Sequence, residues 1–299
     1  MTTSTAPRSR WRASAAAGPW LGPALALILA VVIFPAAYMV WVSTREISGF
    51  GVDRGGAGLE NYRRLLRFEA IGQVLTNTVV WVVGVVLLTV FISLGLAQFL
   101  DKAFPGRQLV RLAVIVPWAA SVVMTSTVFV YGLDPFYGII NRFLVDLHVL
   151  SEPYGFTQRP VSAFLVSMGI AVFVSLPFTT YTLLAGLQAI PGDVLEAAQV
   201  DGAGPAAAYR RVVLPMLRPA LAVATIINII NVFNSLPILR TVTGSLPGYD
   251  ADTTTTLTFK FIQADRQIGT ASALSVVNFV LVLTVIAVYL RVVRPMRED

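Results

Sequence analysis

Six long apolar runs, almost free of charge, constrain this chain more than any other feature. Each is about 20 or more residues long, the length a helix needs to cross the hydrocarbon core of a bilayer. Hydrophobic residues make up 56% of the sequence and charged residues 13%, against about a quarter charged in soluble domains. The sequence therefore predicts an all-α polytopic membrane protein with six spans, at residues 20–43, 74–100, 109–133, 161–188, 220–239 and 270–290.

The basic residues favour a multi-pass protein of the cell (inner or plasma) membrane with both termini in the cytoplasm. Segments assigned inside hold 12 Lys and Arg residues against 10 outside, and their charges crowd the span ends, where the positive-inside rule applies. The exception is the outer stretch 45–67, in which five arginines alternate with acidic residues. The predicted organisation is a basic cytoplasmic tail at 1–19, a six-span domain at 20–293 and a cytoplasmic tail at 294–299.

The net charge of +6 could suggest nucleic acid as a partner. In so apolar a chain, topology signals and attraction to a membrane surface explain it better. There is no cysteine, and the single histidine, His148, falls in a loop. Because a metal site normally needs several ligands, we expect His148 to be an ordinary loop residue and the chain to hold no metal.

The segment 190–219 is the longest stretch in the second half that could not lie in lipid. Pro191 and Gly192 indicate a turn. Asp193 can cap a helix that begins there, and Glu196 follows at the spacing of a capping box.

The rest of this segment predicts a second short helix after a glycine elbow. Gly202 suits the left-handed conformation that ends a helix. Pro205 suits the first turn of the next helix, because its missing N–H would be unpaired there anyway. Leu214-Pro215 then ends or kinks the second helix.

The spacing of these residues resembles the EAA loop of permease subunits from binding-protein-dependent ABC importers. Glu196-Ala197-Ala198 is followed by Asp201-Gly202-Ala203 and, with nine residues between Gly202 and Val212, by Val212-Val213-Leu214-Pro215. Val212 departs from the pattern, which usually has Ile there. In that family the loop is a coupling helix, which docks into a cleft on a separate cytoplasmic ATPase.

The resemblance implies a role for each part of the loop, which we call the EAA loop (residues 190–219). Glu196 would offer a carboxylate to the ATPase, while Ala197 and Ala198 are small enough for close approach. Asp201 and Gly202 would form the bend, and Leu214 and Pro215 would tie the loop to the fifth span. The simpler alternative is that Glu196 only caps a helix and Gly202 only ends one.

Weaker motifs extend the resemblance to sugar-type, maltose-transporter-like permeases. They are the stretches 59–66, 76–78, 135–141, 243–248 and 271–275, so the resemblance runs from about residue 35 to 289. It implies the transmembrane fold of a type I ABC importer. It also implies a second, similar permease subunit, an ATPase dimer and an extracytoplasmic binding protein as partners, the last meeting segments 134–160 and 241–267.

The sequence contains no phosphate-binding loop for ATP. Its two lysines, Lys102 and Lys260, do not follow a glycine, as the lysine of a P-loop must. We expect this chain to bind no cofactor and not to be an enzyme, with ATP and Mg on a separate ATPase. The spans also lack charges in their interiors, which argues against a proton- or sodium-coupled carrier.

Neutral polar residues gather instead in the fifth predicted span. Asn228, Asn231 and Asn234 recur at every third position, with Phe233 and Ser235 beside them. Our hypothesis is that they line a translocation path, where amides pair with sugar hydroxyls and Phe233 stacks on a sugar face. The alternative is hydrogen bonding between helices, worth well under about 2 kcal/mol per contact.

These observations favour one half of the permease of an ATP-driven carbohydrate importer. One alternative is an ABC permease for another solute, such as a peptide or polyamine. The other, of a different class, is an ion-coupled carrier that acts alone.

Overall fold

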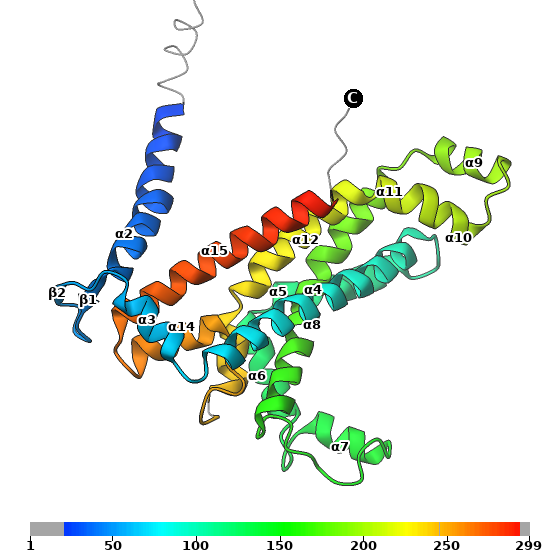
Figure 1. Ribbon diagram of the computed structural model, residues 1–299. Helices are drawn as coiled ribbons and strands as arrows, with labels where there is room; N and C mark the ends of the chain where they lie inside the picture. Colours follow the sequence, from blue (N-terminus) through cyan, green and yellow to red (C-terminus); the bar gives the residue numbers. More distant parts are fainter. Residues whose placement is uncertain (1–20, 245, 294–299) are drawn as a thin grey trace, which may run out of the picture.

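The computed structural model describes residues 21–244 and 246–293, so the two predicted tails lie outside the described part. Almost all of the described chain is helical (Figure 1). The elements are η1 (Leu29–Ile33), α2 (Phe34–Ser43), β1 (Arg45–Ile47), β2 (Asp53–Gly56), α3 (Glu60–Arg67), α4 (Ile71–Asp101), α5 (Arg107–Ala119), α6 (Val122–Gly132), α7 (Ile139–Asp146), α8 (Pro160–Gln188), α9 (Gly192–Val200), α10 (Pro205–Ala208), η2 (Tyr209–Val213), α11 (Leu214–Met216), α12 (Arg218–Phe233), α13 (Leu236–Thr243), α14 (Thr254–Gln263) and α15 (Ile268–Val293).

Four helices of the described chain are long and apolar enough to cross a membrane unbroken. They are Leu21–Ser43, α4, α8 and α15, and they confirm the first, second, fourth and sixth predicted spans. Two further spans are bent: α5 meets α6 at 98°, and the helix Pro205–Met216 meets α12 at 65°. The prediction of six spans holds when each bent pair is counted as one.

The two remaining predicted spans, 109–133 and 220–239, are each interrupted by a break in the helix. Ala120 and Ser121 are extended and separate α5 from α6. Asn234 and Ser235 leave helical geometry, so α12 ends and α13 begins two residues later. Hydropathy records only that these stretches are apolar, and it cannot register a change of backbone direction within them.

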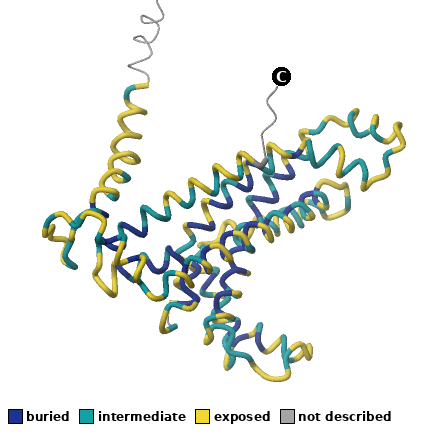
Figure 2. Tube along the Cα trace, in the orientation of Figure 1, coloured by how far each residue is buried: buried dark blue, intermediate teal, exposed yellow. Residues whose placement is uncertain are grey.

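The core lies where α4 and α8 pack along each other and against α12 and α13. Buried residues follow this seam in Figure 2. Gly84 of α4 faces α8, where the tip of the flexible Met168 side chain fills the space that a Cβ would take, 2.5 Å from Met168 Cε. Trp81 on α4 is 1% exposed, and its indole Nε1 donates a hydrogen bond of 2.9 Å to Val232 O, which ties α4 to the end of α12.

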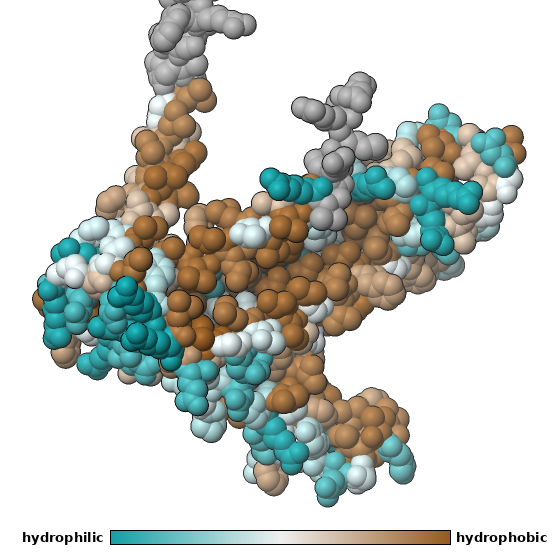
Figure 3. Space-filling view, viewed as in Figure 1, coloured by the Kyte–Doolittle hydropathy of each residue, from teal (hydrophilic) through white to brown (hydrophobic). Residues whose placement is uncertain are grey.

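The first span stands apart from the bundle and meets α15 only toward its α2 end (Figure 1). Large apolar side chains such as Leu27 and Phe34 point outward along it, each 66% exposed. The bundle shows a broad hydrophobic band between two hydrophilic ends (Figure 3). Such a band suits a bilayer, in which apolar side chains are expected on the outside of the protein.

A small two-stranded hairpin and α3 form one end of the bundle. β1 and β2 are antiparallel, with Arg45 opposite Gly56 and Ile47 opposite Asp53. Asn61 of α3 is 2% exposed, and its Nδ2 donates to Ser43 O at 2.9 Å and to Arg45 O at 2.8 Å. The motif at 59–66 therefore lies largely in the short helix α3, which Asn61 fastens to the end of the first span.

Candidate functional site

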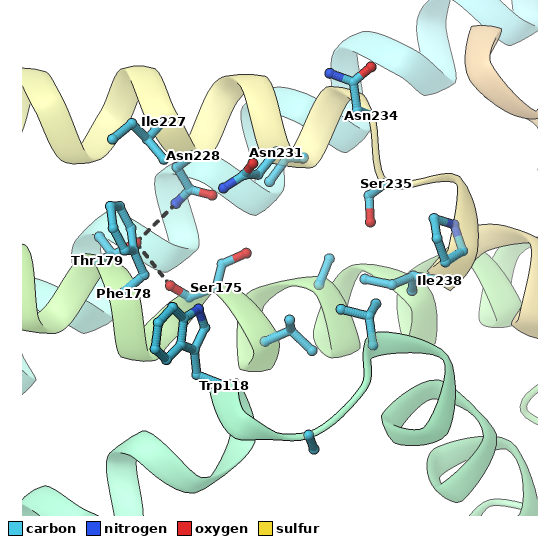
Figure 4. Close-up of a pocket in the computed structure, with 16 residues that line it drawn as sticks. Trp118, Ser175, Phe178, Thr179, Ile227, Asn228, Asn231, Asn234, Ser235 and Ile238 are labelled. Carbon is cyan, nitrogen blue, oxygen red and sulfur yellow. Dashed lines mark hydrogen bonds between the residues drawn. The ribbon is translucent and has the colours of Figure 1, made fainter.

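A polar pocket lies where the broken helices meet inside the bundle (Figure 4). Its volume is about 520 Å³. The break between α5 and α6 forms one wall, the break between α12 and α13 a second, and α8 the third, around its internal Pro177. Irregular backbone at membrane depth is tolerated where it is buried in protein or lines a cavity, and both breaks line this one.

The polar side chains of the pocket come from α8 and α12. Asn228 is 2% exposed, and its Nδ2 lies 3.4 Å from Thr179 Oγ1. Thr179 in turn donates to Ser175 O at 3.0 Å. Asn228 Oδ1 has no hydrogen-bond partner among the described residues. A buried amide oxygen without a partner is costly, and a hydroxyl of a bound solute can supply the missing donor.

Asn231 and Ser235 complete the polar wall formed by the fifth span. Figure 4 shows Asn231 directed into the pocket from α12, with Ser235 beyond the helix end. Asn234 also lines the pocket, but it is exposed and its Nδ2 donates to Ile230 O at 2.9 Å, within its own helix. Asn228, Asn231, Asn234 and Ser235 are therefore brought together as the three-residue spacing predicts.

Phe233 does not line this pocket, and its predicted place on the translocation path stays a prediction. Its side chain is 5% exposed and belongs to the hydrophobic core. Where it reaches a cavity, it faces a separate one between α12, α14 and α15. The aromatic rings of the polar pocket are Trp118 and Phe178.

Sequence reasoning missed Trp118, Phe178 and Ser175 as pocket residues. They lie far from the asparagines in sequence, and only the packing of α5 and α8 beside α12 brings them there. Pro117 and Pro177, each one or two residues away, were available signals, because proline inside a span marks a kink. None of the residues that line the pocket is titratable, so its chemistry is that of neutral hydrogen bonding and aromatic contact.

The EAA loop forms the two short helices that the sequence predicts. α9 ends in a Schellman motif: Gly202 has φ +78°, Gly202 N donates to Gln199 O, and Ala203 N donates to Ala198 O, both at 3.0 Å. Pro205 then occupies the first turn of α10.

The expected capping box at the start of α9 is wrong. The residue that caps the helix is Pro191, and no side-chain cap is formed. Asp193 lies inside the first turn, where its Oδ1 accepts only from the neighbouring Val194 N at 3.1 Å. Because Asp193 lies two residues after the cap position, no capping box forms, and the carboxylate of Glu196 remains exposed and free of an intrahelical role.

The EAA loop projects from the bundle, and none of its residues in α9 or α10 is buried (Figures 1 and 2). Asp193, Glu196, Ala197 and Val200 follow the i, i+3, i+4, i+7 spacing and are all exposed, so they share one face of α9. Val200 is 87% exposed. Sequence reasoning missed this residue, although its spacing from Glu196 and Ala197 was a usable signal.

Leu214 and Pro215 connect the loop to the fifth span. A π-helical turn, η2, precedes Leu214, which begins the short helix α11 with Pro215 in its first turn. The chain bends by 65° at Leu217, which is 1% exposed and packs with Leu183 and Leu184 of α8. The predicted kink is confirmed, and a buried anchor lies at its corner.

Metal-binding geometry is not found among the described residues, which contain no group of three or more His, Cys, Asp or Glu. His148 lies in the turn after α7, with φ 58°.

Comparison with known proteins identifies the family that this chain matches. Residues 89–297 match the family described as binding-protein-dependent transport system inner membrane component. The trehalose/maltose transport system permease protein MalF of Thermococcus litoralis is 33% identical over 276 residues, which cover 92% of each chain. The sulfoquinovosyl glycerol transport system permease protein SmoG of Agrobacterium fabrum is 30% identical, over 92% of this chain and 89% of that protein.

A solved structure shares the fold. It is a chain of a bacterial alginate ABC transporter in complex with an alginate pentasaccharide-bound periplasmic protein, with a TM-score of 0.82 and 19% identity over 98% of this chain and 99% of that one. These findings confirm the resemblance and the type I importer fold. The chain belongs to the family of binding-protein-dependent transport system inner membrane components, the permease subunits of ABC transporters.

Proposed function

We propose that this chain is one half of the permease of a carbohydrate importer and that its polar pocket is part of the sugar path. The observation that carries the proposal is the unpartnered Oδ1 of buried Asn228 beside Asn231, in a pocket of about 520 Å³ formed at helix breaks. Relatives named for trehalose/maltose and sulfoquinovosyl glycerol transport support the substrate class.

The lining suits a neutral, hydroxyl-rich solute. Amide groups both donate and accept hydrogen bonds, so Asn228 and Asn231 can bind a sugar hydroxyl that acts as a donor or as an acceptor. Trp118 and Phe178 offer ring faces to the C–H faces of a sugar ring. The absence of titratable groups from the lining argues against a charged solute and against proton coupling through this pocket.

The EAA loop is proposed to couple the path to a separate ATPase, which would hold ATP and Mg. The exposed face of α9 carries the carboxylates of Asp193 and Glu196, the small side chain of Ala197 and, at one end, the apolar side chain of Val200. We call this face the plug, and we propose that it inserts into a cleft on the ATPase. Movement of this plug would reach α12 through the corner at Leu217. ATP energy would then shift the pathway between inward- and outward-facing states by binding the two states differently.

The remaining partners follow from the same proposal. We place both termini and the EAA loop in the cytoplasm, and the opposite end of the bundle outside. There the segment 134–160 holds Phe136 and Tyr137 81% and 92% exposed, while Asn141 Nδ2 ties its ends together through Leu133 O and Tyr154 O. This rigid, aromatic projection suits a binding protein. A second permease subunit would cover the open side of the polar pocket, giving a heterodimer with an ATPase dimer below it.

Uptake of labelled saccharides by reconstituted complex tests the proposal. The double substitution Asn228→Ala and Asn231→Ala should lower uptake about tenfold or more, because a site that pairs with hydroxyls loses both polar partners. Co-purification of the partner subunits should be unchanged. Asn278→Ala is the matched control, because Asn278 Oδ1 is also buried without a partner among the described residues but lies at the separate cavity, and this variant should leave uptake near normal.

Loss of assembly in the double variant, with no transport defect in the complexes that do form, would assign the asparagines to helix packing instead. The solute panel should include glycerol phosphate, since a relative from Yersinia pseudotuberculosis, 26% identical, is named for its transport. Uptake of that solute but of no neutral saccharide would keep the permease and discard the substrate class.

A further inference from the structure

A second polar pocket lies at the end of the bundle opposite the EAA loop. It is formed by the β1–β2 hairpin, α3 and the first turn of α15, and its volume is about 170 Å³. Hydrophilic residues gather at this end in Figure 3. Three arginines line it, Arg54 from β2, Arg64 from α3 and Arg266 from the turn before α15, and we call it the arginine pocket.

The walls of the arginine pocket are rigid. Asn61 is held by hydrogen bonds to Ser43 O and Arg45 O, as described above. Gly269 packs so tightly against this joint that a Cβ there would lie 2.7 Å from Arg45 O and 2.7 Å from Asn61 Nδ2. The hairpin, α3 and α15 are therefore locked together around the cavity, so a ligand would meet a preformed site.

Two of the three arginines have no acidic partner in the described chain. The ion pairs found there leave out Arg54 and Arg266, and Arg64 makes only a long contact of 3.9 Å with Glu60. One acidic residue, Glu46, also lines the cavity. The lining thus carries three positive charges against one negative charge.

Arg45 nearby shows what a paired arginine in this region looks like. Its Nη2 lies 2.6 Å from Asp53 Oδ2, and hydrogen bonds from Arg45 hold the pKa of the Asp53 carboxyl below its usual range. Arg266 is positioned differently: its guanidinium carbon lies 5.4 Å from the centre of the Phe50 ring. An aromatic ring can hold a guanidinium in place without neutralising it.

The arginine pocket lies at the level of a membrane surface. The first span ends at Ser43 and α15 begins at Ile268, so the cavity lies just beyond the ends of two apolar helices. Beside it, the hairpin turn exposes Phe50 and Val52 by 85% and 61%, and Trp41 is 45% exposed under Arg45. Aromatic and apolar side chains at such a boundary are typical of the headgroup region of a bilayer.

We propose that the arginine pocket binds a phosphate group, supplied by the headgroup of an anionic lipid. Arginine presents a planar fork of donors that pairs with phosphate oxygens in a bidentate way. The first turn of α15 adds backbone N–H groups and the positive end of a helix dipole. The proposal also gives a role to Arg54 and Arg64, two of the arginines in the stretch 45–67 that the positive-inside rule disfavours on this side. It does not depend on what the permease transports.

Native mass spectrometry of the purified transporter complex tests the site with phosphatidylglycerol and phosphatidylcholine as probes. We expect the complex to retain phosphatidylglycerol in preference to phosphatidylcholine. The variant Arg54→Gln with Arg266→Gln should weaken phosphatidylglycerol binding by about tenfold or more, because each removes charge-assisted hydrogen bonds. The control is Arg63→Gln with Arg67→Gln, exposed arginines of α3 that do not line the pocket, and it should retain the lipid.

Thermal unfolding in zwitterionic detergent shows whether the variants are folded, and a shift of the midpoint by phosphatidylglycerol gives a second readout. Millimolar inorganic phosphate forms the other arm. A midpoint shift by phosphate alone, lost in the pocket variant, would support the phosphate site and assign it to a soluble anion. Equal retention of both lipids by folded wild type, together with no response to phosphate, would overturn the proposal. So would equal loss of phosphatidylglycerol in the pocket and control variants.

Discussion

The EAA loop and the polar pocket use proline and glycine in opposite ways. In the loop, Gly202 and Pro205 sit where helices end and begin, and they complete hydrogen-bond patterns that a short segment satisfies alone. At the pocket, both prolines lie inside spans. Pro117 is close to the break between α5 and α6, and Pro177 lies in α8 next to residues that line the cavity. One region is locally determined and exposed, whereas the other exists only through the packing of distant helices.

This difference explains how the two regions can act together. A locally closed unit such as α9–α10 can move as one body when a partner pushes it. A pocket assembled from α5, α8 and α12 changes shape when any one of them moves. Because the loop continues directly into α12, the proposed coupling would carry a displacement of the loop along this helix to the cavity.

The largest effect is expected from Gly202→Pro in the EAA loop. Proline cannot adopt the φ of +78° at this position, and it removes the N–H that bonds to Gln199 O. Insertion and assembly should be near normal while uptake is lost and ATP hydrolysis no longer responds to substrate. Gly204→Ala is the matched control: Gly204 has φ −64° and open space around its Cβ position, so uptake should persist. Full uptake by Gly202→Pro would break the link between the loop and the path.

Next in size is Trp118→Ala in the polar pocket. If the contact between the Trp118 ring and the sugar contributes about 1.4 kcal/mol of binding free energy, its loss should lower uptake about tenfold. Trp118→Phe keeps an aromatic ring and should retain most of the wild-type uptake. Initial rates of saccharide uptake in proteoliposomes measure both. The control is Phe91→Ala, a 77% exposed aromatic residue on α4 that does not line the pocket. Equal loss of uptake in Trp118→Ala and Phe91→Ala would mean that the Trp118 ring contributes through contact with lipid and does not contact the saccharide.

A smaller effect is expected from Trp81→Phe, which tests whether packing holds the pocket in shape. The change removes the hydrogen bond from Trp81 Nε1 to Val232 O and leaves a small cavity. Thermal unfolding of the complex should show a loss of about 1–2 kcal/mol in stability, with the EAA loop still able to bind the ATPase. Unchanged stability would show that the end of α12 is held by other contacts.

The smallest effect concerns pH. Since no residue that lines the polar pocket is titratable, affinity for a neutral saccharide should stay constant between about pH 6 and 8. Equilibrium binding to the purified complex checks this. A pH-dependent affinity in this range would point to a charged group outside the lining and would weaken the account of a neutral path.

The sequence predicts the EAA loop almost residue by residue because its signals are local. Gly202 ends α9 and Pro205 begins α10, whereas the capping box was wrong because Pro191 occupies the cap and Asp193 lies two residues further on. The pocket is different. The three-residue spacing predicted that Asn228 and Asn231 lie together. It could not predict that Phe233 is buried in the core or that Trp118 of another span lines the pocket, because both depend on tertiary packing. Hydropathy predicted the number of spans but not their breaks.

The most direct test is ATP hydrolysis by the complex purified through this chain, in lipid, with its binding protein and a panel of saccharides. The account predicts that one saccharide stimulates hydrolysis in the wild type and that Gly202→Pro abolishes this stimulation while basal hydrolysis remains. A complex in which saccharide stimulates hydrolysis equally with and without Gly202→Pro, or one that copurifies with no ATPase activity, would contradict it.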